Sequence, residues 1–377
     1  MANIVPNKGL IFKSAPSGWP IPGKDLAIEA RDFDLNQAPP TGGVTTKNHY
    51  FSFDPYQRGR MRAPEVKSYS PPYTLGQPIT NRGILRVLKS DNDRFKPGDL
   101  ITSQDATPIE EYSALSADIL RRARVLTNPY GLDPKIYLGA LGMPGLTAWS
   151  SFYEIGEPNR RKLAGEQKKK AGKDVTDDDL RPDTIFVSAA SGAVGQLVGQ
   201  LAKHNGMRVV GSVGDDKKLD FILKDLKFDA GFNYKKLSGK SVTETLKELA
   251  PEGIDIYYEN VGGEQLEAAI SNMNEFGRII ACGMVSQYNL TPDQLYGVKN
   301  LMNIVGKRIK FQGFIVGDLT EKWSQNHQET LSEWLSKGEM KAQMSLTHGI
   351  DNAVEGFLGM LKGENFGKAV LVVNDEV

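Results

Sequence analysis

The stretch Thr184-Ile-Phe-Val-Ser-Ala-Ala-Ser-Gly-Ala-Val-Gly195 decides the fold class of this chain. Its β-branched and aromatic residues predict a strand, and the small residues that follow predict a tight turn that opens a helix. Gly192 and Gly195 allow the backbone and the helix to approach closely, and a helix N-terminus offers N–H groups to a pyrophosphate. Ala190 replaces the first glycine of a full GxGxxG motif, so the turn must be judged in its context.

Strands and helices alternate in the sequence around this turn. The predicted strands are 185–188, 208–213, 230–233, 254–259 and 278–282, and the predicted helices are 194–205, 217–226, 242–250 and 264–273. Strands separated by helices of about ten residues imply βαβ units and a doubly wound parallel sheet. The turn at 189–195 then lies where such a sheet binds a dinucleotide.

The first 145 residues have a different sequence pattern. Short β-type runs are separated by breakers such as Ser17-Gly-Trp-Pro20, Ala38-Pro-Pro40 and Ser70-Pro-Pro72, which predicts a compact β-rich domain. The C-terminal part predicts helices at 319–337 and 351–361 and a closing strand at 368–373. That last strand needs a partner, and the β-rich domain can supply one.

Composition excludes several classes of protein. The 377 residues include 46 Lys+Arg and 46 Asp+Glu, so the formal net charge is zero. A neutral chain has no global attraction to nucleic acid or to an anionic membrane. A single Cys excludes a disulfide scaffold and a Cys-cluster zinc site. The sequence also shows no long apolar run and no signal peptide, so we expect a soluble, cytoplasmic protein.

The segment 157–181 stands apart from its surroundings. It has almost no apolar residues, and a basic run that includes Lys168-Lys-Lys170 precedes Asp177-Asp-Asp179. We predict an exposed loop inserted before the first strand of the sheet. A nucleic-acid-binding arm is the alternative, but the acidic residues offset the field of the basic run.

The second strand of the sheet indicates which cofactor binds. NAD sites place an acid at the tip of this strand to bind the ribose hydroxyls. Here the strand ends Val209-Val-Gly-Ser-Val-Gly214 with no acid, and Lys217 and Lys218 follow. Small residues leave space for a 2′-phosphate, and the lysines attract it. We interpret Asp215 and Asp216 as caps of the next helix, so the sequence favours NADPH over NADH.

Eight blocks together resemble a known family. In order they are Asp54-Pro-Tyr-Gln-Arg58, Leu141-Gly-Met-Pro-Gly-Leu-Thr-Ala148, Ala189-Ala-Ser-Gly-Ala-Val-Gly195, Val209-Val-Gly-Ser-Val-Gly214, Phe232-Asn-Tyr-Lys235, Glu259-Asn-Val-Gly-Gly263, Gly277-Arg-Ile-Ile-Ala-Cys-Gly283 and Gly363-Glu-Asn-Phe-Gly-Lys368. Their order and spacing are similar to the zinc-independent medium-chain dehydrogenases/reductases. The closest branch is that of leukotriene B4 12-hydroxydehydrogenase, also called prostaglandin or alkenal double-bond reductase. The family has only a short link where this chain has 157–181.

The resemblance implies an α/β architecture. It has a GroES-like β-rich catalytic domain (1–140), a Rossmann NADP-binding domain (141–318) with the lysine-rich insertion 157–181, and a C-terminal segment (319–377) that completes the catalytic domain. The implied reaction is NADPH-dependent reduction of a carbon–carbon double bond conjugated to a carbonyl. Hydride goes to the β-carbon and a proton to the α-carbon. Members of the family are often homodimers, and we expect the same here.

A metal site is not expected. The zinc-containing branch of this superfamily needs Cys and His ligands, and one Cys with four scattered histidines (His49, His204, His327 and His348) cannot build its sites. The developing enolate oxygen must therefore be stabilised by hydrogen-bond donors. This requirement favours an enone substrate over a simple alcohol.

The resemblance also implies the site residues. Tyr56 and Tyr288 match tyrosines near the nicotinamide and the substrate oxygen, and Lys218 and Tyr234 match contacts of the 2′-phosphate. The other implied cofactor contacts are Met143, Thr147, Gly192, Ala193, Val194, Gly195, Asn260, Cys282, Gly283, Ser286, Phe314, Ile315, Val316 and Asn365, with Tyr288 also lying against the cofactor. Cys282 is interpreted as a small buried hydrophobe whose backbone is near the cofactor, not as a nucleophile.

Three other functions remain open. A quinone reductase has the same fold and cofactor, and a zinc-free alcohol dehydrogenase acts on hydroxy-lipids in the opposite direction. A non-catalytic NADPH-binding regulator, acting on nucleic acid through 157–181, is the third. The expected partner is a small α,β-unsaturated carbonyl compound, with no nucleic-acid or membrane partner.

Overall fold

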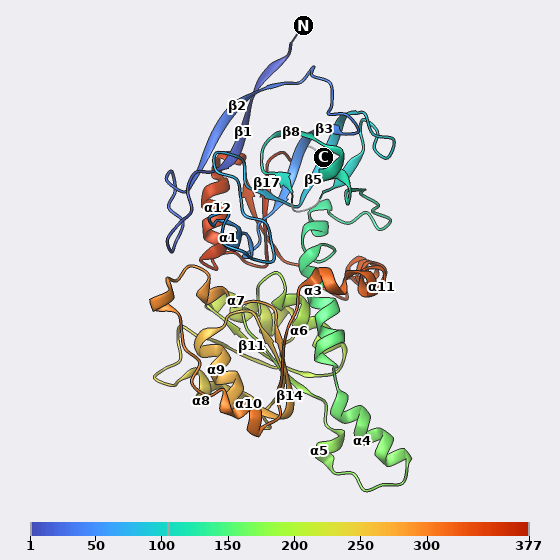
Figure 1. Cartoon of the computed structure of the whole chain (residues 1–377). Helices are drawn as coiled ribbons and strands as arrows, with labels where there is room; N and C mark the ends of the chain where they lie inside the picture. Colours follow the sequence, from blue (N-terminus) through green and yellow to red (C-terminus); the bar gives the residue numbers. More distant parts are fainter. Residues whose placement is uncertain (1, 104–105, 376–377) are drawn as a thin grey trace. The chain divides into compact units, whose positions relative to one another are not determined.

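The computed structural model describes residues 2–103 and 106–375 (Figure 1). The chain divides into two compact units, Met1–Gly139 with Gln343–Val377, and Ala140–Ala342. The expected boundary at 318/319 instead falls inside helix α11 (Val316–Ser336), and the chain returns to the first unit only at Gln343. The reason is that α11 packs on α3 (Met143–Ser151) of its own unit, where Trp149 Nε1 donates to Asn326 Oδ1 at 3.0 Å.

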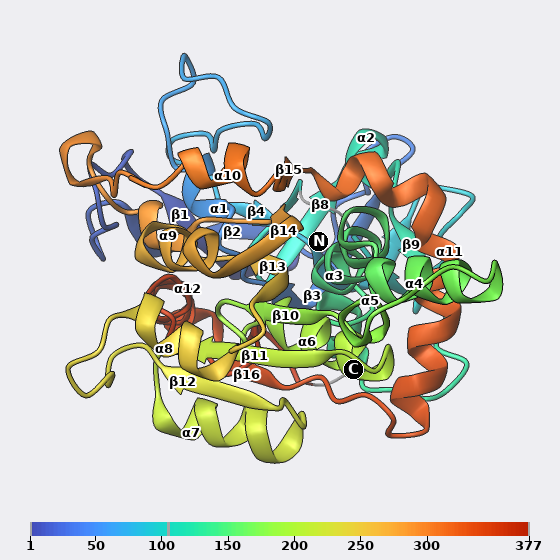
Figure 2. The same ribbon diagram turned by 90° about the horizontal axis from the view of Figure 1, so that it is seen from below.

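The unit Ala140–Ala342 contains the predicted doubly wound sheet. Its six strands are parallel and lie in the order β12-β11-β10-β13-β14-β15, which Figure 2 shows from one side of the sheet to the other. Their bounds are β10 Thr184–Val187, β11 Arg208–Val213, β12 Ala230–Asn233, β13 Ile254–Glu259, β14 Met273–Ala281 and β15 Lys310–Gly313. The direction of growth reverses between β10 and β13, and ligands bind at such a switch point in open parallel sheets.

The connecting helices follow the predicted pattern. They are α6 (Gly195–His204), α7 (Asp216–Asp220) continued by η3 (Phe221–Asp225), α8 (Val242–Leu249) and α9 (Gly263–Asn272). Helix α8 begins at a capping box of Ser241 and Glu244 and buries Val242 and Leu246 on one face, as its spacing predicts. The remaining short elements of this unit are η2 (Phe152–Gly156), η4 (Val285–Gln287), η5 (Pro292–Gln294) and α10 (Met302–Gly306).

The other unit is β-rich, as expected. Its larger sheet has the order β16-β17-β3-β5-β6-β9, with β8 also paired to β3, and two small sheets pair β1 with β2 and β4 with β7. The strands are β1 Ile4–Phe12, β2 Leu26–Asp34, β3 Val44–Ser52, β4 Thr80–Asn81, β5 Gly83–Ser90, β6 Leu100–Thr102, β7 Thr107–Pro108, β8 Tyr112–Leu115, β9 Arg124–Val125, β16 Met344–His348 and β17 Lys368–Val372. The prediction that the closing strand pairs with the β-rich domain is confirmed, because β17 runs antiparallel to β3.

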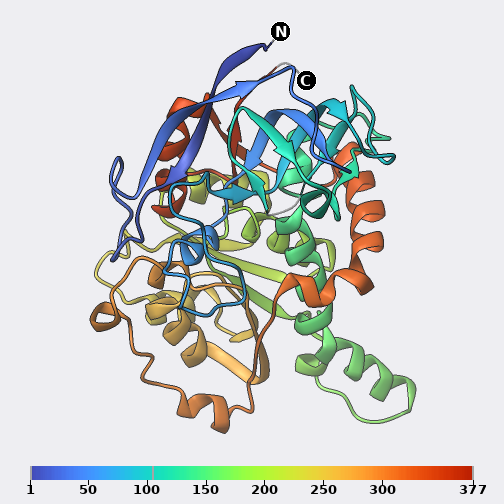
Figure 3. The same cartoon turned by 45° about the horizontal axis from the view of Figure 1, so that its top comes forward.

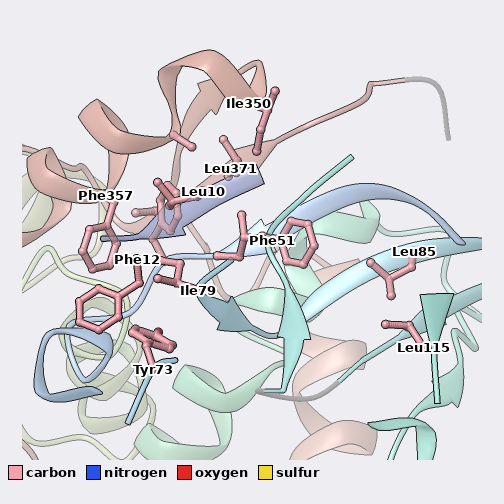
Figure 4. Packing of buried hydrophobic residues seen from close by; sticks show 14 of the residues in the cluster. Leu10, Phe12, Phe51, Tyr73, Ile79, Leu85, Leu115, Ile350, Phe357 and Leu371 are labelled. Carbon is pink, nitrogen blue, oxygen red and sulfur yellow. The ribbon is translucent and has the colours of Figure 1, made fainter. Parts of the chain in front are cut away.

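A large hydrophobic core joins the two ends of the chain in the β-rich unit. Figure 4 shows Leu10 and Phe12 of β1, Phe51 of β3 and Leu371 of β17 packed with Phe357 of α12 (Ala353–Leu361). Figures 1 and 3 both show α12 beside β1 and β2. The C-terminal segment therefore contributes a helix and a strand to a core that begins at the N-terminus. The short helices of this unit are α1 (Gln57–Arg60), α2 (Ala117–Leu120), η1 (Pro134–Leu138) and η6 (Ile350–Asn352).

The insertion 157–181 is not a loop. It forms two helices, α4 (Arg160–Lys170) and α5 (Asp177–Leu180), which Figure 1 shows as a green hairpin. The error has a clear cause, because a helix made mostly of Arg, Lys, Glu and Gln shows no apolar periodicity although those residues favour helix. A side chain at Gly165 would lie 2.4 Å from the Asp179 carbonyl oxygen, so the two helices pack closely. In the described part of the chain, no helix is long and apolar enough to span a membrane.

Candidate active site

The turn between β10 and α6 has the geometry of a phosphate-binding turn. Ala189 has a φ of 47°, and a Cβ on Gly195 would lie 2.4 Å from the Ala189 carbonyl oxygen. Only glycine therefore allows α6 to start so close to the strand. No side chain caps the start of this ten-residue helix, so its first turn, with Gly192, Ala193 and Val194 before it, is suited to an anion.

A buried hydrogen-bond network joins this turn to the end of β13. Ser188, which precedes the turn, accepts a bond from the Asn260 N–H at 2.9 Å, and its carbonyl accepts from Asn260 Nδ2 at 2.8 Å. One hydrogen of the Asn260 side-chain amide thus holds the turn. The predicted cofactor contact at Asn260 is compatible with this geometry.

Glu259 organises the same strand end. Its Oε1 accepts from the N–H groups of Val261 and Gly262 and from the Tyr257 hydroxyl, at 2.6, 2.8 and 2.9 Å. Burial raises the pKa of this carboxyl, although these donors oppose the shift. Its Oε2 is buried and has no partner among the described residues. Sequence reasoning missed this role, because a strand-ending glutamate carries no signal of its own.

The loop after β14 lies along this strand end. The N–H groups of Cys282 and Gly283 donate to the Glu259 carbonyl at 3.0 and 3.1 Å, and Ser286 donates to the Val261 carbonyl through both its N–H and its hydroxyl. A Cβ on Gly283 would lie 3.1 Å from the Tyr288 hydroxyl, so this hydroxyl stands beside the Gly283 backbone. The structure thus brings Asn260, Cys282, Gly283, Ser286 and Tyr288 together at one edge of the sheet.

Cys282 is a poor nucleophile in this environment. Burial raises the pKa of its thiol to about 12, and the nearby Tyr258 hydroxyl opposes the shift only in part. Tyr258 also shares a 2.8 Å hydrogen bond with the hydroxyl of Ser151. The raised pKa agrees with the prediction that Cys282 is not a nucleophile, but the residue is half-buried and not fully buried as predicted.

The tip of β11 forms a second cluster. A Cβ on Gly214 would lie 2.8 Å from the Tyr234 hydroxyl, so this exposed phenol lies over the glycine. Asp215 caps α7 by accepting from the Lys217 N–H at 2.8 Å, as predicted. Asp216 is paired with Asn233 and Lys236. Both acids therefore have local partners.

The other predicted cofactor contacts lie elsewhere. The Thr147 hydroxyl of α3 donates to the Met143 carbonyl at 2.8 Å. Gly313 ends β15 and α11 begins at Val316, so Phe314, Ile315 and Val316 form the junction between this strand and this helix. Tyr56 and Asn365 belong to the β-rich unit, where Asn365 Nδ2 donates to the Gly367 carbonyl at 2.6 Å.

Tyr56 is part of a buried polar network that the sequence did not reveal. Its hydroxyl donates to Asn81 Oδ1 at 2.8 Å, and Asn81 Nδ2 donates to Asp54 Oδ2 at 2.9 Å. Asp54 Oδ1 pairs with the Lys368 ammonium at 3.0 Å, and both of these side chains are buried. Lys368 begins an otherwise apolar strand, and this position could have indicated a buried ion pair in the sequence, because a buried charge needs a partner.

Comparison with known proteins identifies the class. Residues 8–122 match the family described as the N-terminal domain of oxidoreductase, and residues 193–333 match the one described as zinc-binding dehydrogenase. NADP-dependent oxidoreductase RED1 of Cochliobolus heterostrophus is 51% identical over 371 residues, 98% of each chain. The 2-alkenal reductase (NADP(+)-dependent) of Nicotiana tabacum is 39% identical over 380 residues, 100% of each chain.

A solved structure agrees with these matches. CurA of Vibrio vulnificus in complex with NADPH superposes with a TM-score of 0.81 and 30% identity, over 98% of this chain and 99% of that one. The fold and the site thus define an NADP-dependent oxidoreductase of the medium-chain type. The chain belongs to the medium-chain dehydrogenase/reductase family, in the zinc-independent branch that contains alkenal reductases, which confirms the resemblance drawn from the eight sequence blocks.

The description of the second family names zinc, so the side chains of this chain that could bind a metal ion are relevant. Over residues 2–103 and 106–375, no three or more His, Cys, Asp and Glu side chains are placed to hold a metal ion. The single Cys lies beside Tyr258, and His327 is buried with Nε2 2.8 Å from the Ala140 carbonyl oxygen. The residues present do not fit a zinc site of the dehydrogenase type.

Proposed function

We propose that this protein is an NADPH-dependent reductase of carbon–carbon double bonds conjugated to a carbonyl group. NADPH supplies the hydride for the β-carbon when it is bound. The observation that carries the proposal is the position of the Tyr288 hydroxyl. It stands beside the backbone of Gly283, in the loop after β14 at the carboxyl edge of the parallel sheet where ligands bind.

Tyr288 is proposed to stabilise the developing enolate. A neutral phenol donates a hydrogen bond to an enolate oxygen without any metal ion, and such a bond strengthens as charge develops. The tobacco relative, which its name describes as a 2-alkenal reductase, supports an enal as one substrate. Tyr56 is the second predicted active-site tyrosine.

The proposed cofactor site uses the turn 192–195 for the pyrophosphate and the tip of β11 for the 2′-phosphate. Lys218 and Tyr234 are the proposed contacts of that phosphate, since the acids beside them are engaged by α7, Asn233 and Lys236. The remaining contacts are proposed at Met143, Thr147, Asn260, Cys282, Gly283, Ser286, Phe314, Ile315, Val316 and Asn365. We also propose a cytoplasmic location and an unsaturated carbonyl substrate.

A steady-state screen tests the proposed reaction. Purified protein is assayed with NADPH against an alkenal, an enone, a quinone and, with NADP, an allylic alcohol. We expect turnover of the alkenal or enone. In Tyr288→Phe, kcat should fall about 10- to 100-fold while NADPH affinity changes little. Tyr296→Phe, another loop tyrosine, is the matched control. Turnover of the quinone alone, or an unchanged kcat in Tyr288→Phe, contradicts the proposal.

We further propose that the protein forms a homodimer through the β15 edge of its sheet. β15 is the last strand in the described sheet order, and α10 precedes it with Met302 and Val305 exposed by 76% and 66%. An exposed strand edge pairs readily with a second copy, and adjoining apolar side chains add buried area. Light scattering should report a dimer, and Val305→Glu should yield a folded monomer. A monomeric wild-type protein contradicts this proposal.

A further inference from the structure

The orientation of one buried amide, that of Asn81, is fixed by its neighbours. Its nitrogen faces three acceptors: the Ser52 carbonyl at 2.7 Å, Asp54 Oδ2 at 2.9 Å and Gln57 Oε1 at 3.0 Å. The Gln57 amide is oriented in turn, because its Oε1 accepts from the Asp54 N–H at 2.8 Å. Turning the Asn81 amide over would place its oxygen against three acceptors and leave a buried group unsatisfied. Oδ1 of Asn81 must therefore face the Tyr56 hydroxyl.

This orientation decides where the Tyr56 proton points. A phenol has one hydrogen, and Asn81 Oδ1, 2.8 Å away, can only accept. The hydrogen of Tyr56 is therefore directed at Asn81, and only its lone pairs remain for a ligand.

Ionisation of Tyr56 is also disfavoured. Burial raises the pKa of its hydroxyl well above the ordinary value, and the negative charge of Asp54 raises it further, against smaller opposing effects of Arg82 and Arg60. Loss of the Tyr56 proton to a substrate would leave a phenolate near an ionised carboxylate. The residue is thus poorly suited to be the proton source.

The Asp54 carboxylate, which helps to orient the Asn81 amide, is stabilised in its ionised form. Burial tends to raise the pKa of Asp54, but the Lys368 ammonium and the hydrogen bonds from Ser52 and Asn81 outweigh it, so this pKa lies below the ordinary value. Lys368 also donates to the Phe53 carbonyl at 2.5 Å. The ionised carboxylate is a strong, permanent acceptor for the Asn81 amide.

We infer that Asn81 is a positioning residue that makes Tyr56 an oriented hydrogen-bond acceptor in the active site. The ligand group that Tyr56 binds is then a donor, an N–H or O–H of the cofactor or of the substrate. Enolate stabilisation falls to Tyr288. The inference rests on the proposed function for the placement of Tyr56 at the site, and it changes the role expected of Tyr56 from the family resemblance.

The test uses Tyr56→Phe, Asn81→Ala, the double variant and Tyr73→Phe. Tyr73 is a buried phenol of the same network, bonded to Gln57 and Thr80, and it is the control for structural damage. NADPH dissociation constants are measured by fluorescence without substrate, and kcat and KM are measured with an enone.

For Tyr56→Phe we expect kcat within about 3-fold of wild type and about a 3- to 30-fold weaker binding step. A weaker NADPH complex assigns the donor to the cofactor, and a higher substrate KM alone assigns it to the substrate. Asn81→Ala should weaken the same step, and the double variant should be no worse than Tyr56→Phe, because both changes remove one interaction. Tyr73→Phe should leave binding and kcat unchanged.

Two results overturn the inference. A fall in kcat of about 100-fold or more in Tyr56→Phe would identify a proton donor. If neither binding step changes, or if the effects are additive in the double variant, the Tyr56–Asn81 hydrogen bond has only a structural role. If Asn81→Ala does not fold, Tyr56→Phe alone decides between acceptor and donor. If the wild type reduces no enone yet binds NADPH, the proposed reaction fails while the NADPH dissociation constants still test Tyr56.

Discussion

Arg181 and Asp255 form a bidentate ion pair. Arg181 Nη1 lies 2.7 Å from Asp255 Oδ2, and Nη2 lies 3.2 Å from Oδ1. The carboxylate is buried at the start of β13 and also accepts from the Thr184 N–H at 2.9 Å and from Arg161 at 3.1 Å. The two arginines come from the lysine-rich insertion, so one buried charge attaches this helical hairpin to the central strands β10 and β13.

Removal of Arg181 should therefore destabilise the NADP-binding unit. Arg181→Ala leaves Asp255 with Arg161 as its remaining cation, so we expect a loss of about 1–3 kcal/mol in the free energy of unfolding. Lys168→Ala is the matched control, because its partner Asp179 is at the surface and exposed ion pairs contribute within about 0.5 kcal/mol. Denaturant unfolding measures both. Equal effects of the two variants would show that the hairpin is not anchored at Asp255.

Gly214 should control selectivity for the 2′-phosphate. In Gly214→Ala the new Cβ lies 2.8 Å from the Tyr234 hydroxyl, and the exposed phenol must move away. If Tyr234 contacts the 2′-phosphate, the KM for NADPH should rise about 5- to 50-fold, the range of one or two lost charge-assisted bonds. The KM for NADH should change little. Steady-state kinetics with both cofactors measures the difference.

Lys218→Ala tests the proposed 2′-phosphate site independently. It should raise the KM for NADPH and leave that for NADH nearly unchanged. Gly313→Ala is a control, since a Cβ there meets no atom within 4 Å. A similar rise for both cofactors in either test variant contradicts the assignment of the 2′-phosphate to the β11 tip.

The sequence predicted what depends on local pattern. Alternating strands and helices revealed the parallel sheet, and the position of Asp215 before Lys217 revealed a helix cap. It did not reveal α4, because a helix stabilised by charged residues has no apolar stripe. The hydrogen-bond network around Asn81 could not be predicted either. Asp54, Asn81 and Lys368 come together only in the tertiary structure, and no local sequence pattern indicates that they meet.

Glu110 gives stability an unusual dependence on pH. Burial raises the pKa of its carboxyl to about 7, although hydrogen bonds from Ser113 and Asn7 oppose the shift. Between pH 4.5, near its unfolded value, and pH 7 the native state binds more protons than the unfolded state. Stability contributed by this group therefore falls as pH rises through that window, by about 1–3 kcal/mol.

Glu110→Gln should remove this dependence. The variant should gain stability relative to wild type at pH 8 and gain less at pH 5. The comparison is made between proteins at each pH, because His327, whose pKa burial lowers to about 4, acts in the opposite sense and loses stability as pH falls below 6.5. A difference in unfolding free energy that does not change with pH would contradict a raised pKa at Glu110.

Cys282, the single cysteine of the chain, should resist the electrophiles that the proposed reaction consumes. Enals alkylate thiolates, and with a pKa of about 12 only about one thiol in ten thousand is ionised at pH 8, against roughly a quarter for an ordinary cysteine. We expect labelling by iodoacetamide or by an alkenal to be about a thousand times slower than for a free thiol. Intact-mass spectrometry at pH 8 without NADPH measures the rate. The same protein in guanidinium chloride should take up one label quickly, and equally rapid labelling of the native protein would show that the thiol is not shielded.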